Sequence, residues 1–65
     1  MKIKSLAESF TESGILKEVS VFFYNAHVRL EKVSDDTWNI STHKGLERSV
    51  RVRKNGSKYI FEKLV

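Results

Sequence analysis

Hydrophobic and polar residues alternate most regularly near the end of the chain, in the run SVRVRKNGSKYIFEKL at Ser49–Leu64. The Asn55-Gly56 dipeptide divides this run, and it is the preferred pair for a type I′ turn because both turn positions need a positive φ. A turn at this dipeptide sets Val52 opposite Tyr59. One face is then apolar, with Val50, Val52, Tyr59 and Phe61, and the other is mostly basic, with Arg51, Arg53, Lys58, Ile60 and Glu62. We therefore expect a half-buried β-hairpin.

The first residues of the chain carry a helical pattern. Ser5-Leu6-Ala7-Glu8 matches a capping box, in which Ser5 and Glu8 satisfy each other's backbone amides. The apolar residues of this segment share one helical face: Ile3, Leu6, Ala7 and Phe10. Gly14 suits the left-handed position just past a helix end. These features predict a short helix over residues 5–12.

Residues 15–25 (ILKEVSVFFYN) fit two different periodicities. The helical stripe consists of Ile15, Leu16, Val19, Phe22 and Phe23, and the alternating strand pattern of Val19, Val21 and Phe23. We favour a strand because β-branched and aromatic residues dominate the segment, and because a turn at Asn25-Ala26 places its apolar side chains opposite Val28 and Leu30. A second helix is the alternative. Two helices followed by a β-wing would resemble a winged helix-turn-helix.

Two further segments alternate and are separated by turn-forming residues. HVRLEKV at 27–33 and TWNIST at 37–42 flank the sequence Ser34-Asp35-Asp36. The predicted fold class is therefore α+β, in a single domain over residues 1–65: a short N-terminal helix followed by a five-stranded antiparallel β-meander. The sheet is either open or rolled into a small SH3-like barrel. The winged helix-turn-helix is the alternative fold.

Size and composition narrow the class of protein. The 65 residues include 12 Lys and Arg, 8 Asp and Glu and no Cys, which gives a formal charge of +4. A chain of this length buries only a small core, and without disulfides self-association is the remaining support, so we expect a homodimer. No segment has the roughly 20 apolar residues of a membrane span. The first residues also lack the apolar stretch of a signal peptide, so we expect a cytoplasmic protein without membrane contact.

The sequence offers no arrangement of residues typical of catalysis. His27 and His43 are the only histidines, and without cysteine they do not complete a zinc site. The adjacent carboxylates of Asp35 and Asp36 fit a turn, where neighbouring side chains point in different directions. GSKYIF at 56–61 resembles the GSH-x-x-F segment of the HicA-type toxin ribonucleases, but Lys58 stands where that family carries its catalytic histidine. We therefore predict no enzymatic activity, no metal and no cofactor.

The face opposite the apolar one has the composition of a nucleic-acid-binding surface. Cations neutralise phosphates, and aromatic rings stack on bases. The candidate residues are Arg29, Arg51, Arg53, Lys58, Phe22 and Tyr24. We therefore predict a small non-enzymatic binding protein whose leading partner is nucleic acid, either DNA or RNA. The alternative is a protein–protein adaptor or inhibitor, for example a phage or mobile-element accessory protein that binds a host protein.

Overall fold

A computed structural model describes residues 2–64 of the chain. Its elements follow one another as β1 (Ile3–Ser9), α1 (Glu12–Phe22), β2 (Arg29–Ser34), β3 (Thr37–Thr42), β4 (Gly45–Asn55) and β5 (Lys58–Leu64). The five strands form one antiparallel sheet in the order β1-β5-β4-β3-β2. Strands β2 to β5 are a meander, and β1 is added beside β5. The prediction of an α+β fold with an antiparallel meander is confirmed.

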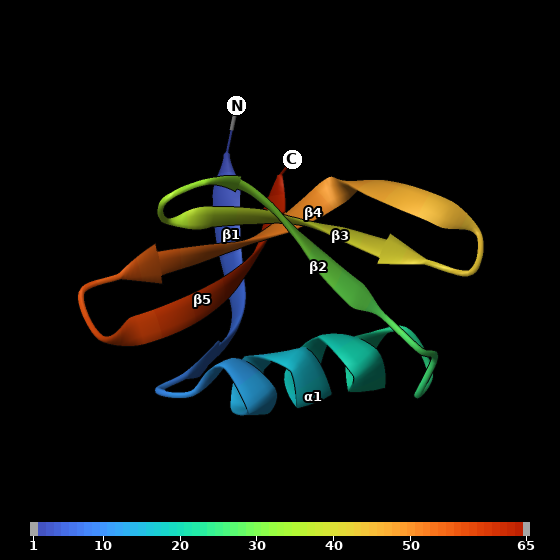
Figure 1. The fold of residues 1–65 in the computed structure, drawn as a ribbon, viewed down its shortest axis with the longest axis horizontal. Coiled ribbons are helices and arrows are strands. Elements are labelled where there is room, and N and C mark those ends of the chain that lie inside the picture. The colour runs from blue at the N-terminus through green and yellow to red at the C-terminus, as the bar shows by residue number, and fades with distance from the viewer. Residues whose placement is uncertain (1, 65) are drawn as a thin grey trace.

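The helix α1 lies against one face of the sheet and leaves the other face uncovered (Figure 1). The core between the two layers consists of Ile15, Val19, Val28, Ile40, Val50, Val52 and Phe61. The sheet is open rather than closed into a barrel. Residues 2–64 contain a single helix, so the winged helix-turn-helix is not formed either. Within the same residues, no helix has the length and hydrophobicity needed to cross a membrane.

The helix predicted over residues 5–12 is wrong, because most of this segment is strand β1. Its backbone pairs with β5 from Ile3 opposite Leu64 to Ser9 opposite Tyr59. A helix of two turns is unstable by itself in water, whereas the strand gains a ladder of hydrogen bonds along the sheet edge. A β-bulge between Ser5 and Ala7 interrupts this ladder. The bulge helps to place both Leu6 and Ala7 against the core, which explains why the segment lacks a strict strand alternation.

The strand predicted within residues 15–25 is also wrong, and the helical alternative is correct. Thr11 caps the N-terminus of α1, where its Oγ1 accepts a hydrogen bond of 3.0 Å from the amide of Gly14. Ile15 and Val19, one turn apart, are fully buried against the sheet. The burial of this apolar stripe outweighs the β propensity of the segment, because helix stability in proteins comes mostly from packing of an apolar face.

The residues predicted to form a turn at Asn25-Ala26 instead end the helix. Tyr24 and Asn25 have φ of 60° and 62°. The amide of Asn25 donates to the carbonyl of Ser20 at 2.7 Å, and the amide of Tyr24 donates to the carbonyl of Val21 at 3.1 Å. These are the two hydrogen bonds of a Schellman motif, whose left-handed position is usually occupied by glycine. Here a tyrosine occupies it.

The turn of the last hairpin lies one residue later than predicted. Asn55 pairs with Lys58, so the turn consists of Gly56 and Ser57. Gly56 has φ of +65°, whereas Asn55 has no positive φ. One left-handed glycine at the first turn position is the pattern of a type II′ turn rather than type I′.

This later turn changes the partners across the hairpin but not the faces. Val52 lies opposite Phe61 instead of Tyr59. Because the pairing moves by two residues, every side chain of the hairpin keeps the face predicted for it. Trp38 of β3 lies opposite Val52 on the core side, where it is partly buried and its ring centroid is 5.6 Å from that of Tyr59.

Candidate functional site

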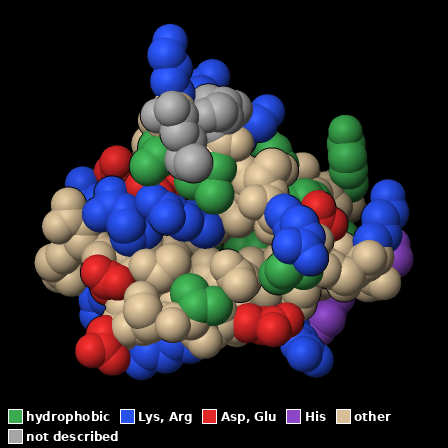
Figure 2. Space-filling model, turned by 90° about the horizontal axis from the view of Figure 1, so that it is seen from above, with side chains coloured by type: hydrophobic (Ala, Val, Ile, Leu, Met, Phe, Trp, Pro, Cys, Tyr) green, Lys and Arg blue, Asp and Glu red, His purple; other side chains and the backbone are tan. Residues whose placement is uncertain are grey.

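The face of the sheet turned away from α1 is polar and carries both cations and anions (Figure 2). Arg51 and Arg53 alternate with buried Val50 and Val52 along β4, so the two arginines point away from the core. Cross-strand pairs identify the neighbours that share this face. We call it the open face, defined by Glu8, Arg29, Glu31, Thr37, Asn39, Ser41, Arg51, Arg53, Lys58, Ile60 and Glu62.

At the centre of the open face, two arginines bind one carboxylate. Arg51 Nε donates to Glu62 Oε2 at 2.9 Å. Arg53 donates to Glu62 Oε1 through Nε at 3.0 Å, and its Nη2 lies 2.9 Å from the same oxygen. The side chain of Glu62 is only 3% exposed, whereas those of Arg51 and Arg53 are 29% and 36% exposed. The carboxylate therefore lies beneath the two guanidinium groups.

Glu62 is ionised in this cluster. Burial alone would raise the pKa of its carboxyl group, but the hydrogen bonds from Arg53 and Arg51 oppose this effect and hold the pKa below its usual range. The same contact raises the pKa of Arg53, first through the hydrogen bond to Glu62 and then through the attraction between the charges. Because Glu62 keeps its negative charge, both arginines are held in fixed positions.

The four cations predicted for the site do share the open face. Arg29 is exposed on the edge strand β2, where it lies opposite Ser41. Lys58 is near the other edge, and its Nζ lies 3.0 Å from Glu8 Oε1. Both partners of that ion pair are more than two-fifths exposed, so solvent screens it and it contributes little to stability.

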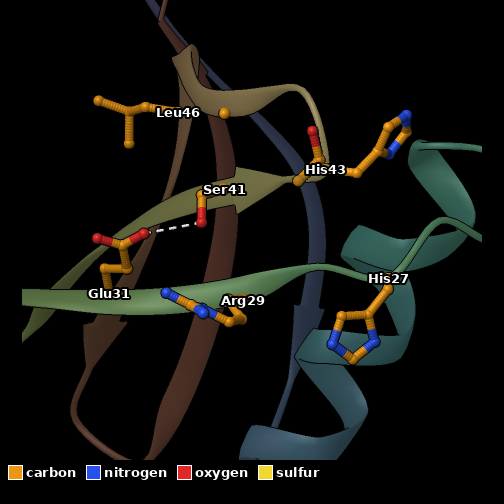
Figure 3. Close-up of a pocket in the computed structure, with 8 residues that line it drawn as sticks. His27, Arg29, Glu31, Ser41, His43 and Leu46 are labelled. Atoms are coloured by element: carbon orange, nitrogen blue, oxygen red, sulfur yellow. Dashed lines mark hydrogen bonds between the residues drawn. The ribbon is translucent and has the colours of Figure 1, made fainter.

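Near Arg29, the open face contains a shallow hollow of about 370 Å³. Figure 3 shows Arg29, Glu31 and Ser41 on its strand side and His27 and His43 at its rim. Ser41 Oγ donates to Glu31 Oε2 at 2.7 Å. The two imidazole rings point in different directions and do not converge on one atom (Figure 3). Among the described residues, no group of three His, Cys, Asp or Glu side chains is placed to hold a metal ion.

The two aromatic residues predicted for the site, Phe22 and Tyr24, do not belong to the open face. Phe22 is the last residue of α1, and its ring packs edge-on against core residue Phe61 at 5.2 Å between centroids. Tyr24 follows the helix and is 95% exposed. Their assignment to the open face followed from the wrong strand at residues 15–25. The aromatic residues of the described strands, Trp38, Tyr59 and Phe61, all lie on the core side.

Sequence reasoning placed Glu62 on the basic face but missed its role. The strand register was the available signal. Glu62 lies directly opposite Arg51, and it is two residues from Ile60, the residue opposite Arg53, on the same face. Opposite charges at such positions attract across a sheet. The depth of burial was not readable from the sequence, because it depends on two long arginine side chains that fold over the carboxylate.

Comparisons of this chain with protein-family models, with curated proteins and with solved structures found no match.

Proposed function

We propose that the open face binds the sugar-phosphate backbone of nucleic acid, in a contact that is independent of base sequence and involves no catalysis. The observation that supports this most is the burial of Glu62 beneath Arg51 and Arg53. The negative charge of the cluster is covered, and the side chains that reach solvent are positive. A phosphate group approaching the centre of the face therefore meets two guanidinium groups first.

The geometry of the cluster leaves donors for such a phosphate. An arginine has five N–H groups. Glu62 occupies only Nε of Arg51, and Nε and Nη2 of Arg53. Because the buried carboxylate fixes both guanidinium groups, a ligand does not have to order them, which lowers the entropic cost of binding. Thr37 and Asn39 of β3 lie directly opposite Arg53 and Arg51 of β4. They add neutral hydrogen-bonding side chains of the kind that contact phosphates.

Within residues 2–64, the aromatic side chains of the strands all point to the core side of the sheet, which favours backbone contact over base stacking at the open face. Single-strand binders gain much of their affinity from aromatic side chains that stack on bases. The described strands present no such ring on the open face, although the exposed ring of Phe10 lies at its edge, with its centroid 5.6 Å from Lys58 Nζ. We therefore expect duplex DNA or RNA to bind at least as tightly as single strands of the same length, with little preference among sequences.

A triple variant tests the proposal without leaving an unpaired buried charge. Arg51→Gln/Arg53→Gln/Glu62→Gln replaces the whole cluster by neutral amides and lowers the net charge by one. Lys17→Gln, on the exposed side of α1, is the matched control because it also lowers the net charge by one. Affinity for a random duplex is measured over a range of salt concentrations. The slope of log K against log salt should fall by about two units in the triple variant and stay nearly unchanged in the control, since each phosphate contact adds about 0.9.

Equal slopes for the two variants would contradict the proposal, because only the overall charge would then matter. Thermal unfolding of each variant shows whether the comparison is made between folded proteins. Negligible affinity of the wild-type chain at every salt concentration would favour the alternative function, a protein–protein adaptor or inhibitor.

A further inference from the structure

A second exposed surface lies at the C-terminal end of α1, on the side of the molecule away from the open face. Three of its residues are apolar and exposed: Val21 by 56%, Phe22 by 44% and Tyr24 by 95%. Phe22 and the adjacent Phe23 pack edge to face, with 5.0 Å between their centroids. Exposed apolar residues that cluster in this way mark interaction surfaces.

Tyr24 is held in an unfavourable backbone conformation. Its φ of 60° lies in the left-handed region, which a residue with a Cβ occupies at a cost of about 1–2 kcal/mol. Packing of the Tyr24 side chain within the chain does not offset this cost, because the side chain is almost fully exposed. A glycine would serve the helix end better. Strain kept at an exposed aromatic residue points to a role outside the monomer.

Next to Tyr24 lies a hollow of about 210 Å³. Its lining residues come from the helix end and from the β3–β4 turn: Phe23, Tyr24, Ala26, Thr42, His43, Lys44 and Glu47. A cavity of about 150 Å³ is enough to hold a benzene ring, so this hollow has room for one aromatic side chain. A protruding ring and a recess of matching size thus lie side by side on one molecule.

The hollow is lined by one positive and one negative side chain, which can meet their opposites when two copies are related by a two-fold axis. Lys44 and Glu47 both line the recess. The carboxylate of Glu47 is oriented by a hydrogen bond of 3.0 Å from Thr42 Oγ1. In a two-fold contact the same patch faces itself, so Lys44 of each copy can pair with Glu47 of the partner subunit.

The edges of the sheet are poorly suited to pairing with another copy. The two edge strands, β1 and β2, each contain a bulge, between Ser5 and Ala7 and between Lys32 and Ser34 respectively. Both also carry charged residues along their length: Lys4 and Glu8 on β1, and Arg29, Glu31 and Lys32 on β2. Bulges and charges at an edge prevent the addition of a further strand.

From these observations we infer that two copies of the chain pair through the end of α1, with Tyr24 of each copy inserted into the recess of the other. The left-handed backbone at Tyr24 directs the ring outward, and the recess beside it receives the equivalent ring. The recess shares Thr42 and His43 with the hollow near Arg29, whereas Arg51, Arg53 and Glu62 at the centre of the open face are not part of this contact. The inference does not depend on the proposed binding of nucleic acid.

Sedimentation equilibrium of the full chain, from micromolar to several hundred micromolar, tests this inference. The wild-type chain should approach dimer mass as the concentration rises. Tyr24→Gly removes the ring and suits the left-handed backbone, so it keeps the fold and should raise the dissociation constant of the dimer at least about tenfold. Tyr24→Phe retains the ring and should dimerise nearly as well as the wild type.

Two controls make the result specific. Phe10→Ser removes an aromatic residue that is 72% exposed but outside the surface, and it should leave the dissociation constant unchanged. Lys44→Glu and Glu47→Lys should each weaken the dimer, and the double reversal should restore it. A wild-type chain that stays monomeric throughout, or a Tyr24→Gly chain that dimerises as strongly as the wild type, would overturn the inference.

Discussion

Arg51 Nε lies 2.9 Å from Glu62 Oε2, and the two residues are directly opposite each other on β4 and β5. Glu62 also binds Arg53, so one buried carboxylate fixes two cations of the open face. The pair therefore has a structural effect in addition to its proposed role in binding. Removing the carboxylate affects folding and the orientation of the arginines together.

Glu62→Gln should lower the free energy of unfolding by about 1–3 kcal/mol at neutral pH, because it removes the charged partner of two hydrogen bonds. The value is at the low end for a buried pair, since both arginines are partly exposed and water screens them. Urea denaturation of the two proteins measures the difference. Equal midpoints and slopes would show that the cluster does not stabilise the fold.

The stability of the wild-type chain should decrease in acid. The pKa of Glu62 is lower in the folded protein than the ordinary value of 4.5, so its contribution is complete above that value. The contribution is lost as the pH falls from 4.5 through the lower folded-state pKa. The pKa of Asp36 is also lowered, by hydrogen bonds from Thr37 and Ser34, and it acts in the same direction. The gap between the unfolding midpoints of the wild type and Glu62→Gln should therefore narrow as the pH falls below 4.5, and a gap that stays constant or widens in acid would contradict this account.

Gly14→Ala should destabilise the chain by about 1–2 kcal/mol, although alanine favours helices by about 1 kcal/mol over glycine. A Cβ at this position would lie 2.1 Å from Ser9 Oγ and 2.8 Å from Thr11 Oγ1, the atom that caps the helix. Both side chains are short, so relief of the clash disturbs the cap. Thermal unfolding measures the effect. A more stable Gly14→Ala variant would mean that the side chains of Ser9 and Thr11 move away from the new methyl group without loss of stability.

Tyr24→Gly should raise the stability of the monomer by about 0.5–1 kcal/mol, because glycine adopts the left-handed conformation without steric cost. The measurement is denaturant unfolding at a protein concentration well below the dissociation constant of any dimer. Asn25→Gly is a useful comparison, since Asn25 has a similar φ but asparagine tolerates that region better. Its gain should be the smaller of the two.

Two single variants, Gly56→Ala and Asn55→Ala, test which residues form the turn of the last hairpin. Gly56 is left-handed with open space around it, so alanine should cost about 1–2 kcal/mol from backbone strain alone. Asn55 has no positive φ, and its replacement should change the free energy of unfolding by less than about 0.5 kcal/mol. Similar losses for both variants would indicate a type I′ turn instead.

The elements that were predicted correctly from the sequence are those whose pattern of apolar and polar residues fits only one type of secondary structure. The alternation of Val50 and Val52 with Arg51 and Arg53 correctly gave the two faces of the last hairpin, and even a turn misplaced by one residue preserved them. Strands β2 and β3 follow from the same kind of pattern. The placement of the cations on a shared face could be predicted for this reason.

The first third of the chain could not be predicted in the same way, because local signals there point against the tertiary arrangement. Ser5 and Glu8 resemble a helix cap, yet their segment pairs with a strand that is almost a whole chain length away. Val19 and Phe23 suit a strand, but they belong to the helix and its cap, which bury Ile15 and Val19. The exchange of these two elements moved Phe22 and Tyr24 to the wrong face of the molecule.

The pairing of β1 with β5 also determines the order in which the protein can fold. Of the five strands, β1 is synthesised first and its neighbour in the sheet, β5, is synthesised last. Until then β1 has no partner strand, and α1 lacks the Phe61 side chain on which Phe22 packs. The meander from β2 to β5 can form through local turns, whereas docking of β1 requires closure of a long loop. Attachment of the first strand is therefore expected to be the slow, late step in folding.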